Sequence, residues 1–240
     1  MNKKKIIIIS IAALLLIAIV FGALYYLLSV LPKEREREEN AAIIKAYYDN
    51  KLSSYEEENE SVGDYEIEVA FLGDSLTDGY NLENYYPRFT TSNRGIGGDT
   101  THGLLSRMEC SAYELKPKAI VMLIGANNLD TMFNDYEEIL LGIKENLPDT
   151  KVVLLSLTPT GGDFADRNKT AAYNNVKIEK LAKKYEFTYV DIFTPLLNTI
   201  TDEIHEIYTT DGLHFSSEGY EVITEVLTPV LEVLLEKKIF

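Results

Sequence analysis

Four short apolar runs, rich in β-branched residues, constrain the fold of this chain more than any other feature. They are YEIEVAFLG at 65–73, KAIVMLIG at 118–125, KVVLLSLTP at 151–159 and FTYVDIF at 187–193. Helical stretches lie between or after them, at about 100–109, 134–147 and 167–185, with a last one from Ser217 onward. Continuous apolar strands that alternate with helices are typical of a parallel sheet covered on both faces. The sequence therefore predicts a three-layer α/β domain.

A fifth segment, RFTTSNRGI at 88–96, is less apolar than the other four and is predicted as a strand at an edge of the sheet. In open parallel sheets, ligands bind beyond the carboxyl ends of the strands. Four polar motifs stand at such ends or just before the last helix: GDSLTDG at 73–79, NRGIGGDTT at 93–101, IGANN at 124–128 and DGLH at 211–214. Taken singly, most of them would be ordinary turns and loops. Together they predict one site at the rim of the sheet.

The residue types in these motifs fit nucleophilic catalysis. A serine hydroxyl such as that of Ser75 becomes a good nucleophile only when a neighbouring base takes its proton. His214 suits that role because the ordinary histidine pKa lies near 6.5, and Asp211, three residues earlier, can orient its ring. An oxyanion also needs fixed donors, which the N–H groups of Ser75 and Gly98 and the side-chain amide of Asn127 could supply.

The same motifs resemble the SGNH or GDSL hydrolases, a family of serine esterases and lipases. GDSLTDG is similar to the first block of that family, GIGGDTT to the second, GANN to the third and DGLH to the fifth. The resemblance covers roughly Val69 to Tyr220 and extends to members like the platelet-activating-factor acetylhydrolase subunits and the lysophospholipases. One departure is Asn128, where the third block more often has aspartate; some acetylhydrolase-like members also carry asparagine there.

The resemblance implies a flavodoxin-like fold with a five-stranded parallel sheet, an exposed site, and catalysis without a metal or other cofactor. It assigns Ser75, Asp211 and His214 as the catalytic residues, and Ser75, Gly98 and Asn127 as the oxyanion hole. Its substrates are esters or thioesters. The acceptor stays open, because the family includes lysophospholipases, thioesterases, carbohydrate esterases and O-acetyltransferases that act on polysaccharide. A binding module with an inactive site is the third class considered, and it is disfavoured because every catalytic position is filled.

The amino-terminal residues predict a membrane anchor. The run Ile6–Leu31 carries no charge and exceeds the roughly 20 residues that cross a bilayer. We therefore divide the chain into a cytoplasmic tail (1–5), a transmembrane helix (6–31), a charged stalk (32–64) and the SGNH-like domain (65–240). The basic start MNKKK favours a cytoplasmic tail and an extracellular domain at the cell membrane. The alternative is a secreted protein, with a signal segment cleaved near FGA at 21–23.

Composition narrows the partners. A net charge of -15 disfavours nucleic acid, whose phosphates would be repelled. The single cysteine, Cys110, excludes an internal disulfide. His102 is predicted on a helix surface rather than in the pocket, and a zinc site built on His205 and His214 is disfavoured because no HExxH motif is present. The oligomeric state stays open.

The rim segments are short, and the residues beside the motifs, such as Thr77, Asp78, Thr100 and Asn128, are small and polar. The sequence therefore predicts short acyl groups, from acetyl to butyryl, on a small ester or an acylated carbohydrate.

Overall fold

The computed structural model describes residues 2–237, and the chain divides into two compact units between Asn50 and Lys51. The first unit is helical. It contains α1 (Lys3–Tyr25), a π-helical turn (Tyr26–Val30) and the beginning of α2 (Leu31–Ser61).

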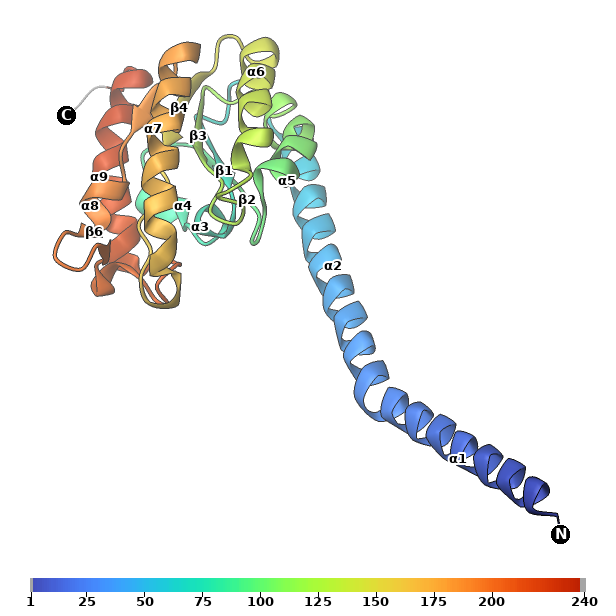
Figure 1. Cartoon of the computed structure of the whole chain (residues 1–240). Coiled ribbons are helices and arrows are strands. Elements are labelled where there is room, and N and C mark those ends of the chain that lie inside the picture. Colours follow the sequence, from blue (N-terminus) through green and yellow to red (C-terminus); the bar gives the residue numbers. More distant parts are fainter. Residues whose placement is uncertain (1, 238–240) are drawn as a thin grey trace. The chain divides into compact units, whose positions relative to one another are not determined.

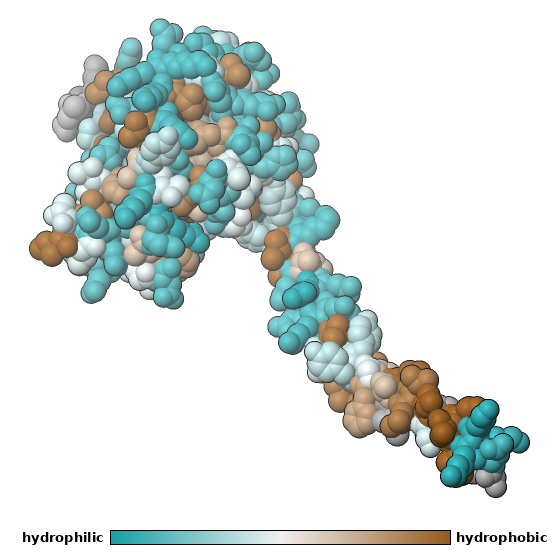
Figure 2. Space-filling view, viewed as in Figure 1, coloured by the Kyte–Doolittle hydropathy of each residue, from teal (hydrophilic) through white to brown (hydrophobic). Residues whose placement is uncertain are grey.

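Apolar side chains are exposed along successive positions of α1, so they cover the helix rather than one stripe of it (Figure 2). Of the helices described, this one alone is long and apolar enough to cross a membrane. A signal sequence near an amino terminus passes the same test of length and composition.

The second unit is built on a five-stranded parallel sheet (Figure 1). Its strands are β1 (Val69–Gly73), β2 (Thr91–Gly95), β3 (Ala119–Leu123), β4 (Lys151–Leu155) and β5 (Thr188–Val190). Their spatial order is β2-β1-β3-β4-β5, which is the flavodoxin-like order. The predicted fold is therefore confirmed, and the least apolar strand, β2, lies at an edge as expected.

In β1, β3 and β4, alternate side chains enter two different cores, which explains the continuous apolar runs of the sequence. In β1, Val69 and Phe71 face the first core, whereas Leu72 faces the second. The first core is covered by α3 (Ser75–Asp78), α4 (Leu82–Tyr85), α8 (Phe193–Leu196) and α9 (Ser217–Leu234). The second is covered by α5 (Thr101–Ser106), α6 (Tyr136–Asn146) and α7 (Asn168–Tyr185).

Several short elements were not predicted. The expected helix at 100–109 is α5 followed by a π-helical turn, Glu109–Tyr113, and a two-stranded antiparallel hairpin joins β6 (Leu197–Asn198) to β7 (Glu203–Ile204). Three of the helices, α3, α4 and α8, have only four residues. Elements this short carry too little periodicity to be recognised in a sequence.

The last turns of α2 belong to the second unit and pack on β2. Tyr55 is 3% exposed, and its hydroxyl donates to the carbonyl of Gly95 at 2.7 Å. The fully buried guanidinium of Arg94 bonds to Glu58 at 2.8 Å and to Asn59 at 2.9 Å. Part of the segment predicted as a stalk thus contributes to the packed domain.

Candidate active site

Ser75 lies in the turn where β1 gives way to α3. The Asp74 carboxylate accepts a hydrogen bond from the backbone N–H of Leu76 at 3.1 Å, which caps this short helix. The Tyr220 hydroxyl, from α9, donates to the carbonyl of Leu76 at 3.0 Å. These two contacts hold the turn on both sides, so the partly exposed Ser75 hydroxyl has a fixed place at the rim of the sheet.

The Asp211–His214 segment forms a tight loop that precedes α9. Asp211 Oδ1 accepts the backbone N–H groups of Leu213 and His214, at 2.9 and 2.7 Å, and Asp211 Oδ2 lies 2.7 Å from His214 Nδ1. Gly212 has a φ of +89°, and a Cβ atom there would come within 2.4 Å of the Gly161 carbonyl oxygen. Only glycine fits this position.

The environment of Asp211 keeps it ionised. Partial burial raises its pKa, but the hydrogen bonds from the side chain and backbone of His214 and from the backbone of Leu213 outweigh burial and lower the pKa to about 2. A permanent carboxylate beside Nδ1 favours the tautomer with a proton on that nitrogen. It leaves Nε2 as the acceptor.

His214 Nε2 lies 3.0 Å from Ser75 Oγ. Asp211, His214 and Ser75 therefore form one continuous chain of hydrogen bonds, and this chain can move a proton off the serine hydroxyl. The side chains of His214 and Asp211 are 43% and 49% exposed. The arrangement is open to solvent, as the family resemblance implied.

The two other predicted donors lie on neighbouring loops. Gly98 follows β2 with a φ of +78° and has open space where a side chain would be, so its backbone is unobstructed. The Asn127 amide donates to the carbonyl of Asp99 at 2.8 Å, which joins the loop after β3 to the Gly98 loop. Asn128, the departure from the family pattern, bonds to Thr101 through both of its side-chain atoms, at 3.3 and 2.9 Å, and so tethers the start of α5.

Arg107 supports these loops and was missed by the sequence analysis. Its guanidinium is 1% exposed and pairs with Asp99 at 2.8 Å. It also donates to the carbonyls of Gly73 and Arg94, at 3.0 and 2.9 Å. One buried side chain thus links the end of β1, the end of β2 and the Gly98 loop. A lone arginine in an ordinary helical stretch gives no sequence signal of such a role.

Asp74 is a second group whose state the sequence did not indicate. It is fully buried, and among the described residues its Oδ2 atom has no hydrogen-bond partner. Burial raises its pKa to about 7, with a further increase from the nearby charge of Asp99, although backbone N–H groups oppose the shift. Asp74 therefore titrates near neutral pH, directly beside Ser75 in the chain.

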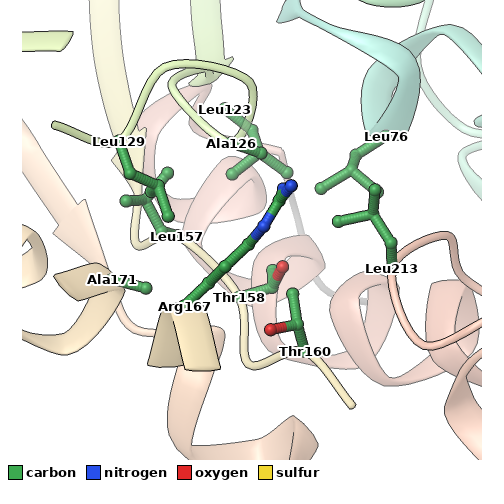
Figure 3. A pocket seen from close by; sticks show the side chains of 10 residues that line it. All are labelled: Leu76, Leu123, Ala126, Leu129, Leu157, Thr158, Thr160, Arg167, Ala171 and Leu213. Atoms are coloured by element: carbon green, nitrogen blue, oxygen red, sulfur yellow. The ribbon is translucent and has the colours of Figure 1, made fainter. Parts of the chain in front are cut away.

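A narrow cavity of about 10 Å³ is lined in part by Leu76 and Leu213, the chain neighbours of Ser75 and His214 (Figure 3). Its lining is mostly apolar and consists of Leu76, Leu123, Ala126, Leu129, Leu157, Thr158, Thr160, Arg167, Ala171 and Leu213. Three of these residues directly adjoin predicted site residues in the chain: Leu76, Ala126 and Leu213. The expectation of small, polar surroundings was wrong here, because leucines narrow the space. Thr77, one of the residues that suggested it, lies within α3 and is buried.

The remaining candidates lie outside this arrangement. The His102 side chain is 77% exposed on α5 and lies 3.3 Å from Asp135, and the His205 ring packs edge-on against Tyr208. Within residues 2–237, no group of three or more histidine, cysteine or acidic side chains is placed to hold a metal ion.

Comparisons with known proteins identify the family. Residues 71–222 match the GDSL-like Lipase/Acylhydrolase family. The platelet-activating factor acetylhydrolase IB subunit alpha2 of Rattus norvegicus is 31% identical over 188 residues, which cover 72% of this chain and 80% of that protein.

Two solved structures share the fold. One, from Streptococcus pneumonia and named for platelet activating factor, superposes with a TM-score of 0.74 at 25% identity and covers 82% of this chain and 99% of its own. The other is an acetylxylan esterase from Geobacillus stearothermophilus, with a TM-score of 0.59 at 17% identity. The match covers 70% of this chain and 95% of that esterase chain. The chain belongs to the GDSL-like lipase/acylhydrolase family and is an ester hydrolase.

Proposed function

We propose that this protein is a membrane-anchored extracellular serine esterase that cleaves short-acyl esters through an acyl-serine intermediate. The observation that carries the proposal is the continuous hydrogen-bonded chain from Asp211 through His214 to Ser75. The 3.0 Å distance from His214 Nε2 to Ser75 Oγ is short enough for direct proton transfer, and the 2.7 Å contact with Asp211 Oδ2 orients the ring. The side chains of His214 and Asp211 are 43% and 49% exposed, which leaves room for a polar alcohol.

In the proposed reaction, Ser75 Oγ attacks the ester carbonyl carbon while His214 Nε2 takes the hydroxyl proton. The carbonyl oxygen becomes an oxyanion that the N–H groups of Ser75 and Gly98 and the amide of Asn127 stabilise. When the C–O bond breaks, His214 returns the proton to the departing alkoxide and an acyl-serine remains. Water then repeats the sequence: His214 takes its proton, the acid leaves, and Ser75 is restored.

The size of the cavity supports short acyl groups. A volume of about 10 Å³ holds roughly one water molecule, and an acetyl methyl group is of that order. Leu76 and Leu213 flank this space, so a longer chain would have to displace packed side chains. The names of two similar proteins, an acetylhydrolase and an acetylxylan esterase, agree with an acetyl group.

A chain-length series of p-nitrophenyl esters tests the proposal. We expect kcat/KM to peak between acetyl and butyryl, activity to survive EDTA, and Ser75→Ala to abolish turnover. A peak at acyl chains of about twelve carbons would instead indicate a lipase or lysophospholipase. Loss of activity with EDTA that zinc restores would indicate a catalytic metal site.

Transfer of the acyl group to a sugar is a second candidate, because the half-exposed His214 and Asp211 leave the acyl-serine accessible to an acceptor other than water. An assay of released acid, with and without an oligosaccharide acceptor, separates the two. For a hydrolase the acid yield is unchanged by the sugar. For a transferase it falls as acylated sugar accumulates.

The uncharged helix supports the proposed anchor. We expect the full chain to sediment with membranes and to resist extraction by high salt, and residues 51–240 to remain in the supernatant. Protease added to intact cells should digest the catalytic unit if it is extracellular. A mature amino terminus near residue 24 would show that the segment is cleaved. The protein would then be secreted and not anchored.

A further inference from the structure

Arg167 is a cationic residue at the rim that the proposed reaction does not use. It ends the 3₁₀ helix Gly162–Arg167, immediately before α7. Its side chain lines the narrow cavity together with Leu76 and Leu213, and Figure 3 shows its guanidinium extending among the apolar side chains toward Ala126. It also lines a wider, open hollow that includes Asn127. Arg167 therefore borders both the narrow cavity and the open hollow.

The charge of this guanidinium is not matched by a carboxylate. Across residues 2–237, no acidic oxygen lies within ion-pair distance of it, and the centroid of the Phe164 ring lies 4.9 Å from its Cζ atom. Arg94 and Arg107, in contrast, are paired with Glu58 and Asp99.

A partly buried cation beside apolar walls is unfavourable unless something compensates it. Asp130 and Asp166 line the same open hollow, but both are exposed and neither reaches the guanidinium. The Phe164 ring holds the guanidinium in place without neutralising it. The N–H groups of the Arg167 guanidinium thus remain available to a ligand.

We propose that Arg167 is a specificity-determining residue that binds an anionic group of the substrate, either a carboxylate or a phosphate. A guanidinium presents a planar fork of N–H donors that matches both groups in a bidentate way. The preferred substrates would then be short-acyl esters that carry a negative charge close to the ester bond. This inference rests on the proposed esterase function, since it assigns the substrate class of the same site.

The test compares matched neutral and anionic esters. On the alcohol side these are p-acetoxybenzamide, p-acetoxybenzoate and p-acetoxyphenyl phosphate. On the acyl side they are p-nitrophenyl valerate and p-nitrophenyl hydrogen glutarate, with the uncatalysed rate subtracted. The quantity measured is the ratio of kcat/KM for each anionic ester to that for its neutral partner. Both rates come from one preparation, so any loss of folded enzyme cancels in the ratio.

We expect Arg167→Gln to lower this ratio by about 10- to 100-fold for at least one anionic ester, which is typical of a charge-assisted hydrogen bond. Arg167→Lys keeps the positive charge, so its ratio should lie between those of wild type and Arg167→Gln. Lys169→Gln is the matched control because it removes the same charge from an exposed position two residues away, and it should keep the wild-type ratio.

An unchanged ratio in Arg167→Gln for every anionic ester, or an equal fall in Lys169→Gln, would overturn the inference. The proposed function fails separately, if Ser75→Ala still hydrolyses the neutral esters.

Discussion

The Nε2 atom of His214 lies 3.0 Å from the Oγ atom of Ser75, although 139 residues separate the two in the sequence. The contact exists because the turn after β1 and the loop before α9 reach the same rim of the sheet. The Tyr220 hydroxyl, which bonds to the Leu76 carbonyl at 3.0 Å, ties α9 directly to that turn.

This contact predicts unequal effects of substitutions along the hydrogen-bonded chain. Ser75→Ala and His214→Ala should each lower kcat by roughly 10⁵- to 10⁶-fold, because either change removes the activated nucleophile. Asp211→Asn should cost less, about 10⁴-fold, since the carboxylate orients and stabilises the ring without reacting. The measurement is kcat with p-nitrophenyl acetate.

His102→Ala is the control for these variants, because its ring is 77% exposed and away from the described cavity. It should retain wild-type turnover and a wild-type melting temperature. Turnover by Ser75→Ala at the wild-type rate would mean that another residue is the nucleophile.

The oxyanion hole is tested by Asn127→Ala. If its amide stabilises charge that develops only in the transition state, kcat should fall by about 10²- to 10³-fold with little change in KM. The amide also holds the Asp99 carbonyl at 2.8 Å, so thermal unfolding should be measured in parallel. A rise in KM with kcat unchanged would assign Asn127 to substrate binding instead.

Asp74 predicts an unusual dependence of stability on pH. Its folded-state pKa is about 7, whereas an unfolded aspartate titrates near 3.9. The folded protein therefore binds the proton more tightly, and this group contributes most stability below about pH 4 and loses it as the pH rises to about 7.

Asp74→Asn should remove this contribution. We expect the free energy of unfolding of wild type, measured by urea unfolding, to fall relative to that of Asp74→Asn as the pH rises from about 4 to about 7. Asp211, whose pKa is lowered to about 2, acts in the opposite direction and only at lower pH. A difference that is constant across the window would show that Asp74 is ionised throughout.

The end of α2 predicts where the catalytic unit can be truncated. Residues 51–240 keep Glu58 and Asn59 beside the buried Arg94, whereas residues 65–240 lose both partners and the buried Tyr55. The Arg94 side chain is fully buried and that of Glu58 is 33% exposed, so removal of Glu58 leaves a buried charge without its partner, which is strongly destabilising. The shorter fragment should therefore unfold at a lower urea concentration.

Glu58→Gln in the longer fragment isolates the ion pair, because it keeps the helix and the hydrogen-bonding shape. It should be destabilised by less than the truncation is. Equal stability of the two fragments would show that the last turns of α2 do not contribute to the free energy of unfolding of the catalytic unit.

The sequence by itself determined the layered fold and the family. The apolar runs identified the strands because every residue of β1 and β3 is buried, and the weaker pattern of β2 marked it as an edge. The motifs around Ser75, Gly98, Asn127, Asp211 and His214 could be recognised because their chemistry and tight turns demand particular residues at particular spacings. Their catalytic roles stay predictions.

Tertiary structure alone decided the surroundings of that site. Leu76 and Leu213 narrow the cavity, Arg107 joins three loops and Arg167 reaches the cavity from the segment before α7. Leucine and arginine are common in any helical stretch, so nothing in their local sequence distinguishes a residue that packs at a rim from one that faces solvent. That distinction, and the unsatisfied burial of Asp74, arise from contacts between segments far apart in the chain, which short-range sequence patterns do not encode.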